Sequence, residues 1–358
     1  MTKQLTNHLA EVNGRKAITY AANDWNRVED MVDKYTWDKL NSQFWLDTRV
    51  PVSNDLKDWR AMSPLEQEVY SKVFLGLTLL DTMQSNDGNA IIKEFAHTPQ
   101  EAAALAQIQF MESVHSKSYS TVFSSLMTTK EIDALYEWGD KHPALQRKAA
   151  IIDEVYKQGK LAAFVKQYPE YATVKMTDKE IKFAGMKTRI ASTFLESGLF
   201  YSGFYTPLKY LGENRMVNAA EIIKLILRDE SVHGTFIGYW FQKDYNNLTT
   251  SEQDELKDWA YELLYDLYSN EVEYINDLYS EIGWVDEVTV FTEYNMNKAL
   301  MNLGFDPLFT DSTADKVNPL VMNGISTSSS NHDFFSTVGN SYLVGTVDAM
   351  QEGDYDID

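Results

Sequence analysis

The sequence contains the same tetrapeptide twice. Glu-Ser-Val-His occupies residues 112–115 and again residues 230–233, so each copy places a Glu and a His three positions apart. Residues three apart lie on one face of an α-helix, and apolar residues flank both pairs at helical spacing. The first stripe consists of Ile108, Glu112, His115, Tyr119, Val122 and Leu126, and the second of Ile223, Ile226, Glu230, His233, Ile237 and Trp240. Each stripe therefore places a carboxylate and an imidazole where a protein core is expected.

Buried polar groups of this kind are costly unless something satisfies them, and a metal ion suits a Glu and a His one turn apart. Either pair alone is equally compatible with a surface ion pair or a hydrogen-bonded core histidine. Two further carboxylates, Asp81 and Glu196, also lie among apolar residues of predicted long helices. Four carboxylates and two imidazoles are the ligand set of ferritin-like di-metal bundles, with Asp replacing one Glu, and they neutralise two divalent cations. The predicted metal ligands are Asp81, Glu112, His115, Glu196, Glu230 and His233.

Helix signals dominate the rest of the chain. Ser63, Thr98 and Thr177 each have a Glu three residues later, which is a typical helix start. Long helices are expected over 64–86, from 98 through the first stripe, over 177–211 and over 214–246, with further helices over 250–281 and 284–303. Shorter helices should fill 130–172, with breaks at Pro143 and Gly159. No alternating strand pattern occurs, so we predict an all-α, ferritin-like helical bundle.

The two ends of the chain differ from the middle. Residues 1–60 are mixed in character, and we expect them to pack on a ferritin-like domain that spans 1–325. The helical pattern stops near Gly304, residues 326–330 are only Ser and Thr, and the final residues are acidic. We therefore predict a flexible acidic tail over 326–358, which either solubilises the protein or docks on a partner.

Composition excludes several classes of protein. A formal net charge of −21 argues against nucleic acid or an anionic membrane as partner. No apolar run has the length of a membrane span, and the first residues lack the apolar core of a signal peptide, so a cytoplasmic protein is expected. The chain has no cysteine, which excludes disulfides and thiolate metal sites. Oxygen and nitrogen ligands favour iron or manganese over structural zinc.

Tyr119 follows His115 by one turn on the same stripe, so its phenol should lie close to the metal ions. A buried tyrosine usually serves packing with one hydrogen bond, whereas beside an oxygen-activating metal pair it can be oxidised to a phenoxyl radical. Spacing alone leaves both alternatives open. The other histidines lack such surroundings and are expected on the surface or in loops, namely His8, His97, His142 and His332.

Several motifs together resemble one family. They are Leu80-Asp81-Thr82, Glu112-x-x-His115-x-x-x-Tyr119, Phe194-Leu195-Glu196-Ser197, Phe200-Tyr201-Ser202-Gly203-Phe204, Arg228-Asp229-Glu230-x-x-His233-Gly234, and Phe44-Trp45 followed by Pro51-x-Ser53-Asn54-Asp55. From about Asn23 to the tail, the chain is similar to the radical-generating small subunit of class I ribonucleotide reductase. The details are most similar to the class Ib branch, whose small subunits use a di-iron or a di-manganese centre.

This resemblance implies roles for individual residues. It implies that the six predicted ligands hold two Mn or two Fe ions per chain and that Tyr119 carries the radical. It also implies that Trp45, Asp229 and His115 form the route out of the metal site, and that Tyr342 passes the radical to the large catalytic subunit. The expected function is generation and storage of a tyrosyl radical for reduction of ribonucleotides to deoxyribonucleotides. The expected partners are the large subunit, a flavodoxin-like activator and a second copy of the chain.

Three features depart from the family pattern. Gly198 stands where a bulky residue is expected, which leaves the binding mode of Glu196 open. The chain ends in Tyr355-Asp356-Ile357-Asp358 without a terminal aromatic residue, and the N-terminus is longer by roughly a dozen residues, judged by where the resemblance begins. Two alternatives share the ligand set: a ligand-binding di-metal oxidase, and a ferritin-like metal-storage protein. Neither needs Tyr119, Trp45 or the tail.

Overall fold

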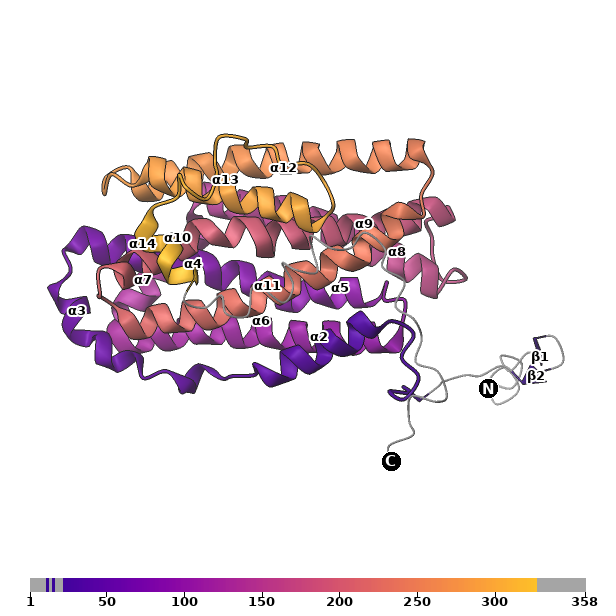
Figure 1. Cartoon of the computed structure of the whole chain (residues 1–358), viewed down its shortest axis with the longest axis horizontal. Helices are drawn as coiled ribbons and strands as arrows, with labels where there is room; N and C mark the ends of the chain where they lie inside the picture. Colours follow the sequence, from indigo (N-terminus) through magenta and orange to yellow (C-terminus); the bar gives the residue numbers. More distant parts are fainter. Residues whose placement is uncertain (1–10, 13–14, 17–21, 327–358) are drawn as a thin grey trace, which may run out of the picture.

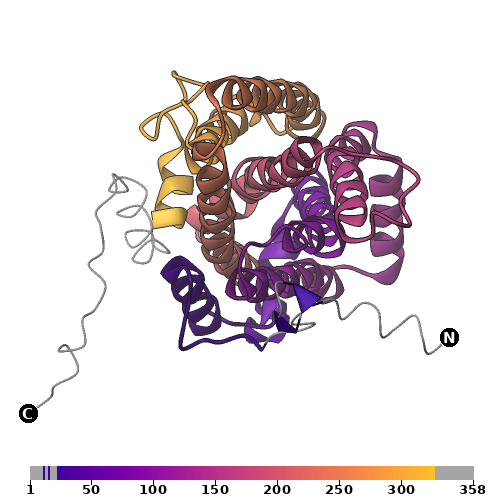
Figure 2. The same ribbon diagram turned by 90° about the vertical axis from the view of Figure 1, so that its right-hand side faces the viewer.

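The computed structural model describes residues 11–12, 15–16 and 22–326. Its long helices run side by side along the long axis of the molecule (Figure 1) and surround a common centre in the end-on view (Figure 2). The α-helices are α2 Met31–Ser42, α3 Leu56–Ala61, α4 Pro64–Met83, α5 Asn89–Lys93, α6 Pro99–Leu126, α7 Thr129–Lys141, α8 Pro143–Gln167, α9 Asp178–Phe194, α10 Phe200–Gly212, α11 Val217–Asn246, α12 Thr250–Tyr279, α13 Val285–Asn302 and α14 Pro319–Ser326. The prediction of a helical bundle is confirmed.

Shorter elements complete the architecture. Two 3-10 segments, η2 (Asp47–Arg49) and η3 (Val52–Asp55), follow α2. Two π-helical segments, η4 (Gln84–Gly88) and η5 (Leu195–Leu199), lie within otherwise α-helical stretches. Near the N-terminus, β1 (Glu11–Val12) pairs antiparallel with β2 (Arg15–Lys16), and these are the only strands among the described residues.

The predicted helix starts have the expected chemistry. Ser63 and Thr177 each form a capping box, in which the hydroxyl accepts a backbone N–H and the following Glu accepts the N–H of the cap. Thr98 also accepts the backbone N–H of Glu101, but the Glu101 carboxylate turns to the backbone N–H of His97 instead. These side chains satisfy amides that have no partner inside the helix.

Two of the predicted long helices are not regular. The expected stop at Asp87-Gly88 is wrong, because η4 carries the chain from α4 directly into α5. In the same way η5 joins α9 to α10 within the stretch predicted as one helix. A π-helical turn widens the helix by one residue and is frequent at functional sites. One such turn contains Glu196 and the other begins three residues after Asp81.

Two other expectations are wrong. Gly159 does not break a helix, because α8 runs uninterrupted from Pro143 to Gln167. A Cβ at Gly159 would lie 2.4 Å from Thr188 Cγ2, so this glycine lets α8 approach α9 closely. The helical pattern also does not end near Gly304, since α14 follows and buries Val321 in the core.

The apolar core is divided into two clusters, with the polar stripe residues between them. Ile108 belongs to the smaller cluster and Tyr119 to the larger one, so α6 passes from one to the other across Glu112 and His115. Along α11 the order is reversed, from Ile226 in the larger cluster to Ile237 in the smaller. The two helices therefore run antiparallel and bring their polar pairs to the same level.

The segment between α2 and α4 is anchored on α11. Asp55 accepts the backbone N–H groups of Asn218 and Ala219 at 3.1 and 2.7 Å, in the first turn of α11. A carboxylate at this position satisfies free amides and interacts favourably with the helix dipole. The 3-10 segment η3 thus caps the helix that bears the second Glu-x-x-His pair.

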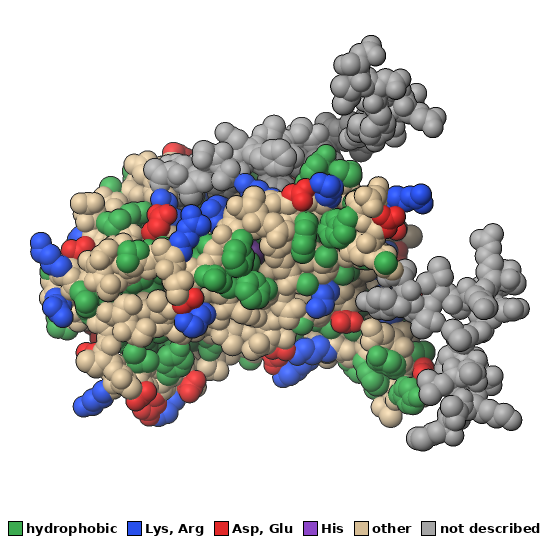
Figure 3. All heavy atoms as spheres, turned by 90° about the horizontal axis from the view of Figure 1, so that it is seen from below, with side chains coloured by type: hydrophobic (Ala, Val, Ile, Leu, Met, Phe, Trp, Pro, Cys, Tyr) green, Lys and Arg blue, Asp and Glu red, His purple; other side chains and the backbone are tan. Residues whose placement is uncertain are grey.

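The surface on the α2 side is shown in Figure 3, where patches of hydrophobic side chains alternate with charged ones. Phe44 and Phe110 are both about half exposed, and their rings stack with centroids 6.2 Å apart. Within the described part of the chain, no helix combines the length and hydropathy that crossing a membrane requires.

His97 lies exposed in the loop between α5 and α6, as the sequence predicted, and it also forms contacts that the sequence did not reveal. Its Nδ1 lies 3.0 Å from the buried Glu101 carboxylate and its Nε2 lies 3.0 Å from Asp244, while its ring stacks on Trp240 at 4.6 Å. Contacts with Asp244 and Glu101 raise the pKa of His97 to about 9. The imidazolium therefore joins the start of α6 to the end of α11. His142, also predicted as ordinary, accepts the Leu145 N–H as the N-cap of α8.

We predict that His97 stabilises the fold in a pH-dependent way. Because its pKa is higher in the folded than in the unfolded state, its contribution is complete below about pH 6.5 and is lost as pH rises towards 9. His97→Gln should lower the free energy of unfolding by about 1 kcal/mol at pH 6.5, a value reduced by solvent screening of a side chain that is 36% exposed, and by little at pH 9.5.

Urea unfolding of wild type and variant at both pH values measures this difference. His142→Gln is the control, because burial lowers the pKa of His142 and its contribution should not change over this range. A His97→Gln effect of equal size at both pH values would contradict the prediction.

Candidate metal centre

The six predicted ligands meet at the centre of the bundle. α4 supplies Asp81, α6 and α11 supply the two Glu-x-x-His pairs, and η5 supplies Glu196. All six side chains are at most 1% exposed. Their ligand atoms form two sets, each within 4.8 Å: Asp81, Glu112, His115 and Glu230 in one, and Glu112, Glu196, Glu230 and His233 in the other. The shared members are Glu112 and Glu230, which therefore lie between two possible metal positions.

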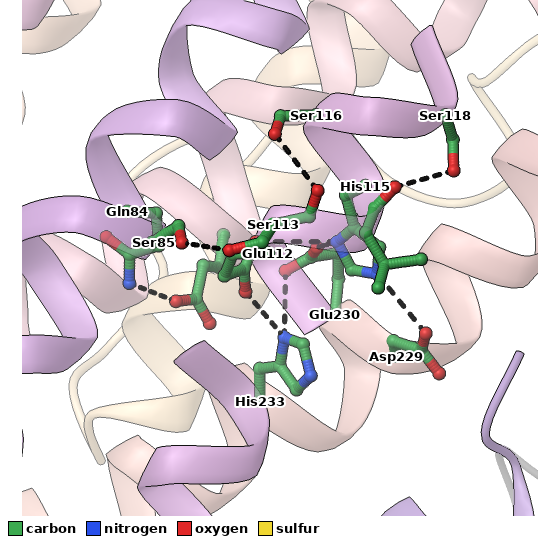
Figure 4. A network of polar contacts seen from close by, with 12 residues as sticks. Gln84, Ser85, Glu112, Ser113, His115, Ser116, Ser118, Asp229, Glu230 and His233 are labelled. Atoms are coloured by element: carbon green, nitrogen blue, oxygen red, sulfur yellow. Dashed lines mark hydrogen bonds and ion pairs between the residues drawn. The ribbon is translucent and has the colours of Figure 1, made fainter. Parts of the chain in front are cut away.

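The two Glu-x-x-His pairs, one on α6 and one on α11, contact each other across the site (Figure 4). His233 Nδ1 lies 2.9 Å from Glu112 on the opposite helix but 3.5 Å from Glu230 on its own. His115 Nδ1 lies 3.0 Å from Glu230 and 3.4 Å from Glu112. Each Glu-x-x-His pair falls within one of the two ligand sets, so each pair can contribute to one ion. In addition, each imidazole lies closer to the carboxylate of the other helix than to its own.

The unsatisfied atoms of the site fit metal ions. Both oxygens of Asp81, Glu112 and Glu230, as well as Glu196 Oε2, are buried without a hydrogen-bond partner among the described residues. The same holds for Nδ1 of His115 and both ring nitrogens of His233. Leaving so many buried polar atoms unpaired is costly, and a bound cation satisfies them together. Oxygen and nitrogen donors in this number suit iron or manganese.

The electrostatics of the site indicate the same chemistry. Burial and the charge of Glu112 raise the pKa of Asp81 and of Glu196 well above the ordinary range. Burial opposes the charged form of His115, but contacts with Asp229, Glu112 and Glu230 prevail and raise its pKa. Without metal, the site therefore retains protons to offset its carboxylates. Divalent ions replace those protons when they bind.

A second group of residues connects His115 to the N-terminal segment. Asp229 Oδ2 accepts the indole N–H of Trp45 at 2.6 Å and lies 3.2 Å from His115 Nε2. The rings of Trp45 and His115 are nearly parallel, with centroids 5.8 Å apart. The structure thus brings together the three residues that the resemblance implied. It adds Gln43, whose amide donates to Asp229 Oδ1 at 2.7 Å and whose own backbone carbonyl accepts from Arg228.

Tyr119 lies where its stripe placed it. It is 0% exposed, and its ring packs edge-on against Phe74 with centroids 5.6 Å apart. Burial, followed by the charges of Asp81 and Glu230, raises the pKa of its phenol well above the ordinary value. The phenol is therefore kept protonated beside the carboxylates. Tyr342 lies outside the described residues.

Sequence reasoning missed the residues around Glu196. Gln84 donates to Glu196 Oε1 and to Ser192 Oγ, and its carbonyl accepts from the Tyr156 hydroxyl at 2.6 Å. Gln84 stands one turn after Asp81 on the same stripe, so its polarity at a core position was the available signal. Nothing in the sequence pointed to Tyr156, which comes from α8.

The question raised by Gly198 has a structural answer. A Cβ at this position would lie 3.3 Å from Met296 Cγ and 3.7 Å from its Cα. Helix α13 therefore occupies the space where a bulky residue was expected. The hydrogen bonds from Gln84 and Ser192 restrict Glu196 instead.

Comparison with known proteins agrees with this geometry. A sequence profile described as "Ribonucleotide reductase, small chain" matches residues 22–319. The chain belongs to this family. It is 42% identical over 341 residues to ribonucleoside-diphosphate reductase 2 subunit beta of Escherichia coli K12, covering 95% of this chain and 99% of that protein. It is 43% identical to the subunit beta nrdF2 of Mycobacterium tuberculosis H37Rv, covering 96% and 99%.

A solved structure extends the comparison. The fold superposes on the crystal structure of Streptococcus sanguinis dimanganese(II)-NrdF with a TM-score of 0.78 and 54% identity, covering 86% of this chain and 99% of that one. Membership in the ribonucleotide reductase small-chain family makes the protein part of an oxidoreductase. It also favours the reductase over the oxidase and storage alternatives.

We predict that the shared carboxylates and the unshared ones respond differently to substitution. Glu112→Gln should weaken binding of both metal ions, because Glu112 belongs to both ligand sets. Glu196→Gln should weaken only one ion, by more than the ~10–100-fold that loss of an outer partner causes. Calorimetric titration of the metal-free variants with Mn(II) measures both affinities. If Glu112→Gln weakened one ion and left the other unchanged, Glu112 would not lie between two metal positions.

Proposed function

We propose that this chain is the radical-generating small subunit of a class Ib ribonucleoside-diphosphate reductase. In this account it holds a dinuclear metal centre, oxidises Tyr119 and supplies the radical to a large subunit that reduces ribonucleotides. The observation that carries the proposal is the convergence of six buried, largely unpaired ligand groups beside a buried tyrosine. The same site is joined to Trp45 by hydrogen bonds through Asp229.

The proposed role of the metal centre is to oxidise Tyr119. Two redox-active ions, once bound and oxidised, supply the power to take one electron from a phenol. Tyr119 gives up that electron together with its proton, and the nearby carboxylate of Asp81, whose charge already acts on the phenol, is the candidate acceptor for the proton. The apolar surroundings of Tyr119, including Phe74, exclude water from its ring and prolong the life of the radical.

The same geometry supports a route for the radical out of the site. Trp45 donates its indole proton to the Asp229 oxygen that also faces His115 Nε2, so electron and proton shifts can be coupled along this row. Gln43 donates to the other oxygen of Asp229, and Arg228 donates to the backbone carbonyl of Gln43, so both help to hold the middle of the row in place. We propose that Tyr342 in the tail receives the radical and passes it to the large subunit.

The partners follow from this assignment. The chain has no cysteine, whereas the resemblance implies that ribonucleotide reduction needs thiols, so the substrate step belongs to the large subunit. We further propose a homodimer and activation by a flavodoxin-like protein. The similar Streptococcus sanguinis structure is a dimanganese(II) form, which favours manganese as the working metal. Metal analysis of protein purified from its own host tests this choice, and iron alone with a full radical yield would exclude it.

Tyr119→Phe should retain two metal ions and lose the radical and all reductase activity. The phenol is not a ligand, and phenylalanine preserves the packing volume, so the free energy of unfolding should change by less than about 1.5 kcal/mol. Electron paramagnetic resonance of the reconstituted protein measures the radical. Tyr279→Phe, which removes another buried and hydrogen-bonded phenol, is the matched control and should keep the signal. Full activity of Tyr119→Phe would remove this residue from the mechanism.

Removal of residues 332–358 should leave generation of the radical intact and abolish its transfer to the large subunit. The truncated protein retains every predicted metal ligand and Tyr119, so its tyrosyl spectrum should be normal. It should bind its large subunit weakly and show no turnover. Tyr342→Phe should bind normally and still fail to turn over, because phenylalanine cannot relay the radical. A normal rate of ribonucleotide reduction by the truncated form would show that the tail serves solubility only.

A further inference from the structure

A buried polar chain reaches the metal site from the side opposite Trp45. It starts at Tyr156 on α8, passes through Gln84 in the π segment η4, and ends at Glu196 in the π segment η5. All three side chains are 0% exposed. Gln84 and Tyr156 take no part in the oxidation of Tyr119 proposed for the metal centre. Burying an amide and a phenol beside a carboxylate is nevertheless unfavourable unless they form hydrogen bonds there.

The hydrogen bonds in this chain have a fixed direction. The Tyr156 hydroxyl donates to the Gln84 carbonyl oxygen at 2.6 Å, which leaves the Gln84 amide NH₂ facing Glu196. That NH₂ group donates to Glu196 Oε1 and to Ser192 Oγ, and the Ser192 hydroxyl also lies 3.1 Å from the same Oε1. Reversing the Gln84 amide would place a carbonyl oxygen against a carboxylate, so Glu196 sets the orientation of the amide and the Tyr156 hydroxyl holds the amide in place by donating to its oxygen.

The consequence for Glu196 is that its two oxygens become different. Oε1 accepts from Gln84 and Ser192, whereas Oε2 is buried without a partner. Glu196 belongs to only one of the two ligand sets, the one that contains His233. A carboxylate with one oxygen engaged in this way has the other available to a metal ion, and it cannot swing freely into a chelating position.

The local backbone is built for this arrangement. A Cβ at Gly88 would lie 2.1 Å from Gln84 Oε1 and 2.8 Å from the Tyr156 hydroxyl, so only glycine leaves room for their hydrogen bond. Gly88 ends the π segment that Gln84 begins. The widened turn therefore supplies both the amide and the space in which it meets the phenol.

We propose that Gln84, held in place by its hydrogen bond from Tyr156, is a positioning residue that holds Glu196 to one-oxygen coordination of the metal ion on the His233 side. This inference rests on the proposed dinuclear centre. It gives that ion a restraint that the ion on the His115 side lacks, because Glu196 is absent from the ligand set that contains His115. In this family member, the restraint on Glu196 comes from a hydrogen bond rather than from a bulky residue at position 198.

The test uses full-length, metal-free protein titrated with Mn(II), and the Co(II) absorption spectrum as a report on coordination number. Gln84→Met keeps the length of the side chain and removes its hydrogen bonds. Tyr156→Phe removes only the hydroxyl that donates to Gln84, and Gly88→Ala displaces Gln84 through its Cβ. Asn270→Leu and Tyr279→Phe are the controls, because each removes a buried hydrogen bond that involves neither Glu196 nor Gln84.

Gln84→Met should weaken one Mn(II) ion about 10- to 100-fold, leave the other within about threefold, and change the Co(II) spectrum. Tyr156→Phe and Gly88→Ala should act on the same ion with smaller effects, and the controls on neither. If Gln84→Met does not fold, the latter two variants carry the test. Unchanged affinities and spectrum, or equal weakening of both ions, would overturn the proposal. An unchanged Tyr156→Phe would overturn the role of Tyr156. Wild-type protein that binds fewer than two ions would instead refute the dinuclear centre itself.

Discussion

The mutual repulsion of four buried carboxylates is the constraint on which the rest of this structure depends. Two like charges 4 Å apart repel by about 4 kcal/mol at an effective dielectric constant of about 20, and this site holds several such pairs. Protons offset part of that repulsion in the metal-free state, as the raised pKa values of Asp81 and Glu196 indicate. Two divalent cations offset it more completely and also satisfy the ring nitrogens of the two histidines. Burying these carboxylates thus destabilises the fold, and the apolar clusters around the site must offset that free energy.

The fold supplies that support from several directions. Two apolar clusters enclose the site along α6 and α11, and the antiparallel course of these helices makes each imidazole face the carboxylate of the other helix. Outer partners then give the two sides of the centre different surroundings. Asp229 joins His115 to Trp45 on one side, while Gln84 and Tyr156 restrain Glu196 on the other. In the proposed function the first side serves electron transfer, and in the further proposal the second side controls coordination.

Much of the site could be predicted from the sequence, because helical periodicity fixes which side chains share a face. The stripes through Glu112 and Glu230 contain only buried residues in the structure, and the lone carboxylates Asp81 and Glu196 lie at the same level. Periodicity within one helix could not predict the closer contact of Glu112 with His233, since that depends on how α6 meets α11. The π segments could not be predicted either. Each is a single wider turn inside an α-helix, so the residues before and after it still follow the helical pattern, offset by one residue. The contact of His97 with Asp244 could not be predicted because the two residues are 147 positions apart in the sequence.

The central claim is that six side chains hold two metal ions and that Glu112 and Glu230 contact both of them. Anomalous X-ray diffraction at the manganese edge, from crystals of Mn(II)-loaded protein, tests it most directly. Two anomalous peaks are expected at the centre of the bundle, one beside Asp81 and His115 and one beside Glu196 and His233, with both shared carboxylates between them. A single peak, or two peaks that Glu112 and Glu230 do not bridge, would contradict it.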